Sequence, residues 1–175
     1  MLTGKNRKST DKFYTNPETV DICFELFKSN IDNNILLVEP SAGNGAFMKK
    51  LQPYQFVAYD IEPETANITK KDFLTVDLND FNKPLAFIGN PPFGRQSSLA
   101  KKFIKHITKC SNTTIIGFIL PKSFKKESMQ KCFPLHYHLI NQIDLPENSF
   151  NIAGNIHDVP CVFQIWRKQE NNRVI

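Results

Sequence analysis

Six short apolar runs, separated by segments with helical spacing, restrict the fold of this chain more than any other feature. The runs cover residues 34–40, 55–61, 85–90, 113–121, 137–146 and 158–168. Most are continuously apolar, which is typical of strands that are buried on both faces of a sheet. Helices are expected over residues 17–29, 45–51, 98–110 and 123–132. This alternation predicts an α/β doubly wound fold, with a mostly parallel sheet and helices on both faces.

The last two runs are connected differently from the others. The segment between them, residues 147–157, reads ENSFNIAGNIH and has no helical spacing. Parallel neighbours need a crossover, usually a helix, so these two strands are expected to pair antiparallel as a hairpin. At the other end of the chain, Asn16 is expected to cap the first helix, because Pro17 suits an early helical position.

The length and composition fit a single domain. Of 175 residues, 41% are hydrophobic and 22% are charged, which allows one compact core. The unit is expected to fill residues 1–175 without a separate target-recognition domain. Residues 1–12 are interpreted as a basic tail, and residues 169–175 as a frayed C-terminal tail. No apolar run approaches the roughly 20 residues of a membrane span, so a soluble protein without a membrane partner is predicted.

The cysteines give an expectation about the compartment. Four are present, and none forms a C-x-x-C pair. Scattered cysteines of this kind are interpreted as core thiols in a reducing, intracellular environment, which predicts a cytoplasmic protein. Histidines show no metal-ligand spacing with cysteines or acids, so no metal site is predicted.

The net charge of +5 is compatible with an anionic partner. Basic residues gather at residues 5–12, 101–105 and 122–126. Clustered lysines can neutralise phosphates and release counterions, but lysines also simply solubilise many surfaces. Composition alone therefore leaves nucleic-acid binding and an ordinary solvated face both open.

A glycine-rich turn follows the first strand. After the run ILLV the chain reads EPSAGNGAF, which places the acid Glu39 ahead of Gly43 and Gly45. Glycines at the carboxyl end of a strand let the backbone approach a ligand, and open α/β sheets bind ligands at that edge. The turn matches neither G-x-G-x-x-G nor G-x-x-x-x-G-K-[ST], so it is neither of those two phosphate-binding motifs.

Acidic residues follow the next strand. Asp60 and Glu62 come about 20 residues after the glycines, where a carboxylate can bind the two hydroxyls of a ribose. Further on, Asp72 stands beside Phe73, which offers a polar acceptor next to an apolar wall suited to an adenine ring. Each acid alone is equally typical of a solvated loop; their order and spacing favour a nucleoside site.

Five segments together resemble the class I S-adenosylmethionine-dependent methyltransferases, and in particular the amino-methylating group with the motif [DNS]-P-P-[YFW]. They are DKFYTNPETV, EPSAGNGAF, AYDIEP, KDFL and GNPPFG, and the resemblance runs from about Asp11 to Lys168. It implies a Rossmann-like, mostly parallel seven-stranded sheet that ends in an antiparallel hairpin. It also implies S-adenosylmethionine as cofactor. The cofactor-binding residues that it implies are Phe13, Tyr14, Thr15, Glu39, Ser41, Gly43, Gly45, Asp60, Glu62, Asp72, Phe73 and Asn90.

The segment GNPPFG supplies a chemical reason for that assignment. The exocyclic amine of adenine is a poor nucleophile, because its lone pair is delocalised into the ring. If the side-chain oxygen of Asn90 and the backbone carbonyl of Pro91 accept its two hydrogens, the nitrogen can pyramidalise and expose its lone pair. Proline has no N–H and a fixed φ, so Pro91 and Pro92 make a rigid loop that presents acceptors. We expect Asn90, Pro91, Pro92 and Phe93 to be the catalytic motif.

The substrate side of the site is expected to hold a base. Phe93 offers a flat surface for stacking, worth about 1–3 kcal/mol per base. A base in a duplex must be flipped out to reach such a pocket, so a single-stranded or looped substrate costs less. Phe150 is expected either to close the pocket or to be a core aromatic. The residues predicted to bind substrate are Phe93, Arg95, Lys101, Lys122 and Phe150.

The resemblance leaves alternatives open. It includes ribosomal-RNA and DNA adenine methyltransferases, so the substrate is expected to be nucleic acid, either RNA or DNA. A protein glutamine-amide methyltransferase uses the same Asn-Pro-Pro pocket, but it usually has Tyr where this chain has Phe93, and it has a helical domain ahead of the glycine loop. A non-catalytic, cofactor-binding scaffold is the third reading. A protein partner that supplies substrate recognition is compatible with the lack of a recognition domain.

Overall fold

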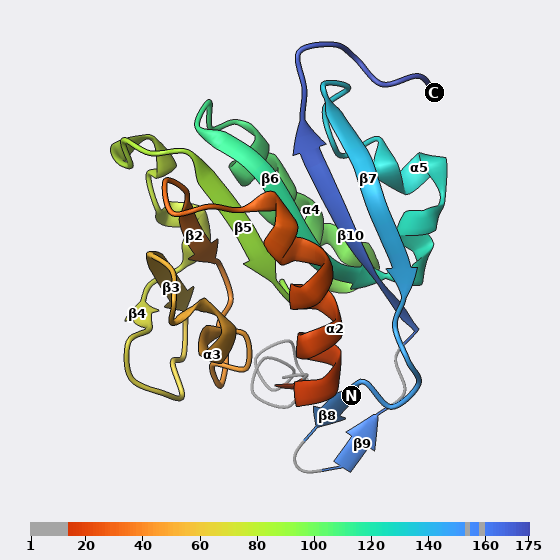
Figure 1. The fold of residues 1–175 in the computed structure, drawn as a ribbon. Helices are drawn as coiled ribbons and strands as arrows, with labels where there is room; N and C mark the ends of the chain where they lie inside the picture. The colour runs from red at the N-terminus through yellow and green to blue at the C-terminus, as the bar shows by residue number, and fades with distance from the viewer. Residues whose placement is uncertain (1–13, 153–154, 158–159) are drawn as a thin grey trace.

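The computed structural model describes residues 14–152, 155–157 and 160–175, and Figure 1 shows their arrangement. Its centre is a seven-stranded sheet with the order β4-β3-β2-β5-β6-β10-β7. The strands of this sheet are β2 (Leu36–Glu39), β3 (Phe56–Asp60), β4 (Thr69–Lys70), β5 (Leu85–Gly89), β6 (Thr113–Pro121), β7 (Tyr137–Asp144) and β10 (Cys161–Lys168). Only β10 runs antiparallel to its neighbours, β6 and β7.

The predicted fold class is confirmed. Each of the six apolar runs contains one strand of the sheet, and the last two runs pair antiparallel as expected. The seventh strand, β4, was not among the predicted runs. It consists of two exposed polar residues, Thr69 and Lys70, so no apolar pattern marks it. The sheet as a whole matches the seven-stranded arrangement that the resemblance to class I methyltransferases implies.

Helices cover both faces of the sheet (Figure 1). Helix α2 (Pro17–Phe27) and the short α3 (Met48–Leu51) pack on one face with Leu37 and Ile88. Helix α4 (Ser98–Thr108) packs on the other face with Val38 and Phe87, the chain neighbours of those residues. Successive residues of a strand point to opposite faces, so continuously apolar strands serve both cores.

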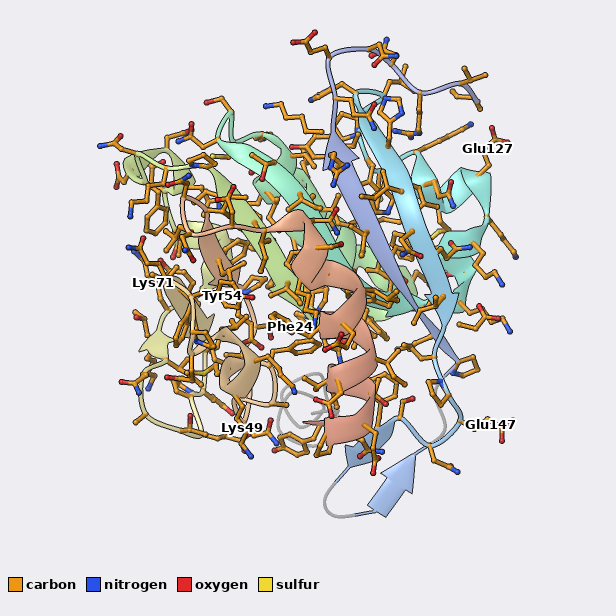
Figure 2. All side chains as sticks on the ribbon, in the orientation of Figure 1. Phe24, Lys49, Tyr54, Lys71, Glu127 and Glu147 are labelled. Carbon is orange, nitrogen blue, oxygen red and sulfur yellow. The ribbon has the colours of Figure 1, made fainter. Side chains whose placement is uncertain are left out.

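The packing of α2 depends on a glycine in β6. A Cβ atom at Gly117 would lie 2.6 Å from Cδ2 of Phe27, so only glycine lets this ring approach the sheet. Phe27 is fully buried, and the burial of such a ring contributes about 1.5–3 kcal/mol. On the same helix, Phe24 makes an edge contact with Tyr54, with 6.0 Å between ring centroids (Figure 2).

One local expectation was met in part, and two were wrong. Asn16 is the N-cap residue of α2, and its carbonyl accepts the N–H of Val20 at 3.0 Å, but its side chain makes no capping hydrogen bond; its Nδ2 donates to the carbonyl of Asn148. The helix expected over 45–51 begins only at Met48. The helix expected over 123–132 is replaced by the 3₁₀ turn η5 (Lys122–Lys125) and the short α5 (Glu127–Gln130), because Lys126 between them is extended.

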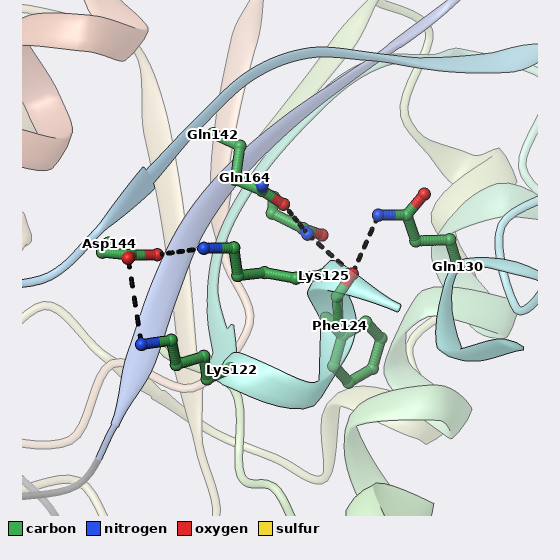
Figure 3. A network of polar contacts seen from close by, with 7 residues as sticks. All are labelled: Lys122, Phe124, Lys125, Gln130, Gln142, Asp144 and Gln164. Carbon is green, nitrogen blue, oxygen red and sulfur yellow. Dashed lines mark hydrogen bonds and ion pairs between the residues drawn. The ribbon is translucent and has the colours of Figure 1, made fainter. Parts of the chain in front are cut away.

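A buried polar network ties this irregular segment to β10 (Figure 3). The Gln164 side chain is fully buried, and its Nε2 donates to the carbonyl of Phe124 at 2.9 Å and to Oε1 of Gln142 at 2.7 Å. Its Oε1 accepts from the indole N–H of Trp166 at 2.9 Å. An unsatisfied buried amide would cost about 1–3 kcal/mol, so these partners fix η5 against the sheet.

The C-terminal tail is anchored, which corrects the expectation that it is frayed. Residues 169–175 form no helix or strand, yet the Arg173 guanidinium donates to the carbonyls of four residues. These residues are Gln130, Phe133, Pro134 and Tyr137. The guanidinium also lies 5.2 Å from the ring of Trp166. Cation–π contact and charge-assisted hydrogen bonds together hold the tail beside the start of β7.

A second, three-stranded sheet was not predicted. It has the order β1-β8-β9 and consists of β1 (Tyr14–Thr15), β8 (Phe150–Ile152) and β9 (Asn155–His157). Both of its pairings are antiparallel. It lies at the end of the molecule where β2, β3 and β5 have their carboxyl ends (Figure 1). Among the described residues, no helix has the length and apolar character needed to cross a membrane.

Candidate functional site

A cavity of about 890 Å³ lies where three parallel strands end. Glu39 ends β2, Asp60 ends β3, and Asn90 directly follows β5. All three residues line the cavity, and Thr15 of β1 and Phe150 of β8 line it from the small sheet. An open α/β sheet binds ligands in the crevice beyond the carboxyl ends of its strands, so this cavity is the candidate site.

Most of the residues singled out in the sequence line this one cavity. They are Tyr14, Thr15, Glu39, Ser41, Gly43, Asp60, Glu62, Asp72, Phe73, Asn90, Pro91, Pro92, Phe93, Arg95 and Phe150. Gly45, Lys101 and Lys122 are not part of the lining. Phe13 lies outside the described residues. The five segments on which the resemblance rests are therefore brought to one place, and Phe150 joins them from a sixth.

The three residues outside the lining have other surroundings. At Gly45, φ is +81° and a Cβ atom would lie 3.2 Å from Oγ1 of Thr65, so this glycine packs under the segment that follows β3. Lys122 lies 3.9 Å from Oδ2 of Asp144, and Lys125 donates to Oδ1 of the same carboxylate at 3.0 Å (Figure 3). Lys122 thus takes part in an exposed ion pair with Asp144. Lys101 is half-buried on α4.

Asp60 holds the glycine loop in place through hydrogen bonds. Its Oδ2 accepts the backbone N–H of Gly43 at 2.8 Å, and its Oδ1 accepts that of Glu62 at 2.8 Å. The N–H of Glu64 in turn donates to the carbonyl of Gly43 at 3.3 Å. Both oxygens of Asp60 therefore hold the loop after β2 against the loop after β3. Glu62 is exposed at the cavity and stands nearer to solvent.

Glu39 is the buried carboxyl group of the site. Its side chain is 1% exposed, and Oε2 has no hydrogen-bond partner among the described residues. Burial, together with the negative charge of Asp60, raises the pKa of Glu39 well above its ordinary value. A buried polar atom without a partner costs free energy, so this oxygen is suited to a ligand that brings a hydrogen-bond donor.

Asp72 and Phe73 form the next part of the wall. Oδ1 of Asp72 accepts the N–H of Leu74 at 3.0 Å, which starts the 3₁₀ turn η2 (Phe73–Thr75). The ring of Phe73 is 1% exposed and contacts an aromatic cluster that includes Phe103 at 5.3 Å between centroids. Phe73 therefore fixes this wall mainly by packing, while Asp72 remains exposed.

The Asn-Pro-Pro-Phe loop is attached firmly to α4. The carbonyl of Phe93 accepts the N–H groups of Leu99 at 3.0 Å and Ala100 at 3.2 Å, which satisfies donors in the first turn of the helix. Gly94 has φ of +72°, and a Cβ atom there would lie 2.7 Å from Cβ of Leu99. The residues that follow, Gln96 and Ser97, also have positive φ. This tight turn fixes the backbone that carries Asn90.

Asn90 and Thr15 both line the cavity, and their side chains are in contact. Nδ2 of Asn90 lies 3.4 Å from Oγ1 of Thr15, to which it donates. Phe93 and Phe150 both belong to the hydrophobic cluster under α2, and Phe150 is 1% exposed. The lining thus contains the Asn90 amide together with the rings of Phe93 and Phe150.

Several lining residues were missed by sequence reasoning. Ile61 directly follows Asp60 and is 58% exposed, which is unusual for a large apolar residue. Leu99 and Phe103 lie one turn apart on α4, and Cys161 begins β10. The position of Ile61 after the acid could have indicated a role; nothing local in the sequence marks Cys161. Burial raises the pKa of the Cys161 thiol to about 12, so it stays protonated at neutral pH.

In the described part of the chain, no group of three or more His, Cys, Asp or Glu residues is placed so that it could hold a metal ion. Two of the histidines make backbone contacts instead. Nε2 of His106 lies 2.8 Å from the carbonyl of Val76, and Nε2 of His138 lies 2.7 Å from that of Asn171.

Comparison with known protein families shows to which family the chain belongs. Residues 19–172 match the model of the EDM2 methyltransferase-like domain, which covers most of the sequence. The chain belongs to the EDM2 methyltransferase-like domain family. Protein ENHANCED DOWNY MILDEW 2 of Arabidopsis thaliana is 24% identical over an alignment of 178 residues that covers 95% of this chain. The match spans only 14% of the length of that plant protein.

The EDM2 methyltransferase-like domain shares its fold with solved methyltransferases. The 23S rRNA methyltransferase ErmE superposes with a TM-score of 0.69 and 16% identity, over 94% of this chain and 72% of that chain. The 1,6-didemethyltoxoflavin-N1-methyltransferase of Burkholderia thailandensis, solved with S-adenosylhomocysteine, has a TM-score of 0.64 and 9% identity. That match covers 89% of this chain and 80% of the other. At these identities the likeness establishes a Rossmann-like methyltransferase fold.

Proposed function

We propose that this chain is an S-adenosylmethionine-dependent methyltransferase that acts on the exocyclic amine of adenine in nucleic acid. One observation carries the proposal: the Asn-Pro-Pro-Phe loop, the glycine loop and the acids after β3 line the same cavity. A rigid acceptor loop beside a nucleoside-sized cavity suits the methylation of a flat amine. Membership in a methyltransferase-like family and the shared fold support the reaction class.

S-adenosylmethionine is the cofactor, and when bound it supplies a methyl group on a positively charged sulfur. The residues present fit its parts. The unpartnered oxygen of Glu39 suits its ammonium group, since that group brings the donor that Oε2 lacks. Glu62, exposed at the cavity, suits the ribose hydroxyls, while Asp60 supports the loop. Asp72 and the exposed side chain of Ile61 suit the edge and the face of its adenine.

The chain's own part in the reaction is to hold the amine. The Asn90 side-chain oxygen and the Pro91 carbonyl accept its two hydrogens, so the nitrogen lone pair is localised. Because the loop is fixed by Pro91, Pro92 and the bonds from Phe93 to α4, the acceptors are in place before charge develops. No strong base is needed at this step, since the amine becomes acidic once it carries a fourth bond.

The target base stacks on Phe93. Phe150, which lines the cavity but is 1% exposed, packs in the core behind the pocket wall. A base inside a duplex must be flipped out to reach a cavity of this kind, so single-stranded or looped nucleic acid is the favoured substrate. The net charge of +5 and Arg95 at the cavity suit a phosphate backbone, and the fold neighbour ErmE is, by its name, an rRNA methyltransferase.

Incubation with methyl-labelled S-adenosylmethionine tests the proposal. Purified protein is given unmodified RNA, unmodified DNA or a peptide pool in parallel, with Asn90→Ala as the matched inactive control. Label in RNA or DNA that disappears with Asn90→Ala supports the proposal and tells the two nucleic acids apart. Label only in peptide would contradict it and favour an amide methyltransferase. Tight cofactor binding without label in any pool would favour a scaffold.

A further inference from the structure

The carboxyl group of Glu39 is enclosed between two strands at the wall of the cavity. Glu39 ends β2 and is 1% exposed, although it belongs to the lining. The last residue of β5 passes directly beside it: a Cβ atom at Gly89 would lie 3.3 Å from Cγ of Glu39 and 3.9 Å from its Oε1. Oε2 has no hydrogen-bond partner among the described residues. A carboxylate in such surroundings loses its solvation, so burial favours the neutral, protonated acid.

The charged groups around Glu39 do not offset the effect of burial. The negative charge of Asp60, which ends β3, adds to it, and together they raise the pKa of Glu39 well above its ordinary value. The other titratable residues of the lining are Tyr14, Glu62, Lys71, Asp72, Arg95 and Cys161. Tyr14 and Cys161 stay neutral because their pKa values are raised. The other four are exposed, so water and salt screen their charges.

We infer that Glu39 is protonated in the free protein and gives up its proton when the ammonium group of the cofactor binds, so that cofactor binding releases a proton to the solvent. The inference rests on the assignment of that ammonium group to Glu39 under the proposed function, and it does not depend on the methyl acceptor. The ammonium brings a positive charge and N–H donors to Oε2, which favours the carboxylate. The O–H bond of the carboxyl group breaks, its proton passes to the buffer, and an ion pair remains in the site.

This coupling gives the cofactor affinity a defined pH dependence. Below the pKa of Glu39 in the free protein, binding must displace a proton, so the affinity rises about tenfold per pH unit. Above that pKa the carboxylate is already formed, and the affinity levels off. An amide does not titrate, so the affinity of Glu39→Gln should stay constant over the same range. The carboxyl group of Glu62 also lines the cavity but is exposed, so Glu62→Gln should keep the pH dependence of wild type.

Calorimetry counts the released proton directly. S-adenosylhomocysteine serves as the ligand, because it carries the same ammonium group and is not consumed. The heat of binding is measured at about pH 5.5, above the ordinary pKa of a carboxyl group, in two buffers that differ in ionisation enthalpy. Wild type and Glu62→Gln are expected to release roughly one proton per bound ligand, and Glu39→Gln none. No release by wild type, or equal release by wild type and Glu39→Gln, would overturn the inference.

An infrared measurement keeps the inference testable if Glu39→Gln binds the ligand too weakly for calorimetry. The carbonyl band of a protonated carboxylic acid is compared in free wild type and free Glu39→Gln at the same pH, and then in wild type with S-adenosylhomocysteine. Free wild type is expected to show a band that Glu39→Gln lacks and that ligand binding removes. Identical spectra of the two free proteins, or a band that persists in the complex, would overturn the inference. Failure of the proposed function is a separate result, namely wild-type protein that labels no nucleic acid.

Discussion

The carboxyl group of Glu39 is buried next to the charge of Asp60, and its Oε2 has no hydrogen-bond partner among the described residues. The two acids differ in what they do. Asp60 uses both oxygens to hold backbone N–H groups of the loops around it, whereas Glu39 carries an acceptor that the fold leaves unused. Such an arrangement costs stability in the free protein and suits the binding of a cationic donor group.

The first prediction concerns Glu39 and pH. Burial raises the pKa of Glu39 above its ordinary value of 4.5, so folding favours the protonated form. The stability from this group is complete below that ordinary value and is lost as pH rises through the folded-state pKa. In urea denaturation without cofactor, Glu39→Gln should remove this loss and be more stable than wild type at pH 8. Its cofactor affinity should fall about tenfold.

The exposed carboxyl of Glu147 supplies the control for that prediction. Glu147→Gln should leave both the pH dependence of unfolding and the cofactor affinity unchanged. If Glu39→Gln lost stability at pH 8 and bound cofactor as well as wild type, the assignment of Glu39 to the cofactor site would be wrong.

Gly94 is predicted to be indispensable to the junction between the Asn-Pro-Pro-Phe loop and α4. A Cβ atom there meets Leu99 at 2.7 Å in a backbone with φ of +72°. Gly94→Ala should lower the free energy of unfolding by about 2–5 kcal/mol, which combines left-handed strain with overpacking. Gly43 also has a positive φ, of +56°, but nothing within 4 Å of its Cβ position. Gly43→Ala should therefore cost only about 1–2 kcal/mol, and equal losses would contradict the packing argument.

Arg173 is predicted to stabilise the end of the sheet. Its guanidinium donates to four carbonyls and lies over Trp166, a geometry that the three donors of a lysine cannot reproduce. Arg173→Lys should lower the free energy of unfolding by about 1–3 kcal/mol in thermal or urea denaturation. Arg167, which is exposed and whose side chain donates to Asn30, is the matched control. If Arg173→Lys lowered the free energy of unfolding no more than Arg167→Lys, the contacts of the Arg173 guanidinium would contribute nothing to stability.

The sheet could be predicted from the sequence because most of its strands are buried on both faces. Such strands appear in the sequence as uninterrupted apolar runs. The same logic fails for β4, whose residues Thr69 and Lys70 are exposed. It also fails for β1 and β8, which pair across more than 130 positions and carry no periodic pattern. The break at Lys126 was not visible either, because the segment around it suits a helix by composition; tertiary contacts of Phe124 with Gln130 and Gln164 decide its path.

The candidate site was predictable to the extent that motifs mark strand ends. Glu39, Asp60 and Asn90 each stand at the end of a strand or directly after one, so parallel pairing brings them together. The contact of Asn90 with Thr15 and the place of Cys161 depend on the small sheet and on the antiparallel strand β10, which no local pattern encodes. Lys101 and Lys122 were chosen for their charge alone, and neither lines the cavity.

Mass spectrometry of nucleosides tests the central claim most directly. RNA and DNA without modifications are incubated with S-adenosylmethionine and either wild-type protein or Asn90→Ala, then digested and separated. If Asn90 holds the target amine, the wild type should form N6-methylated adenosine or deoxyadenosine at a rate about 10²–10³ times higher than Asn90→Ala. A methyl group on any atom other than that amine, or equal yields from both proteins, would contradict it.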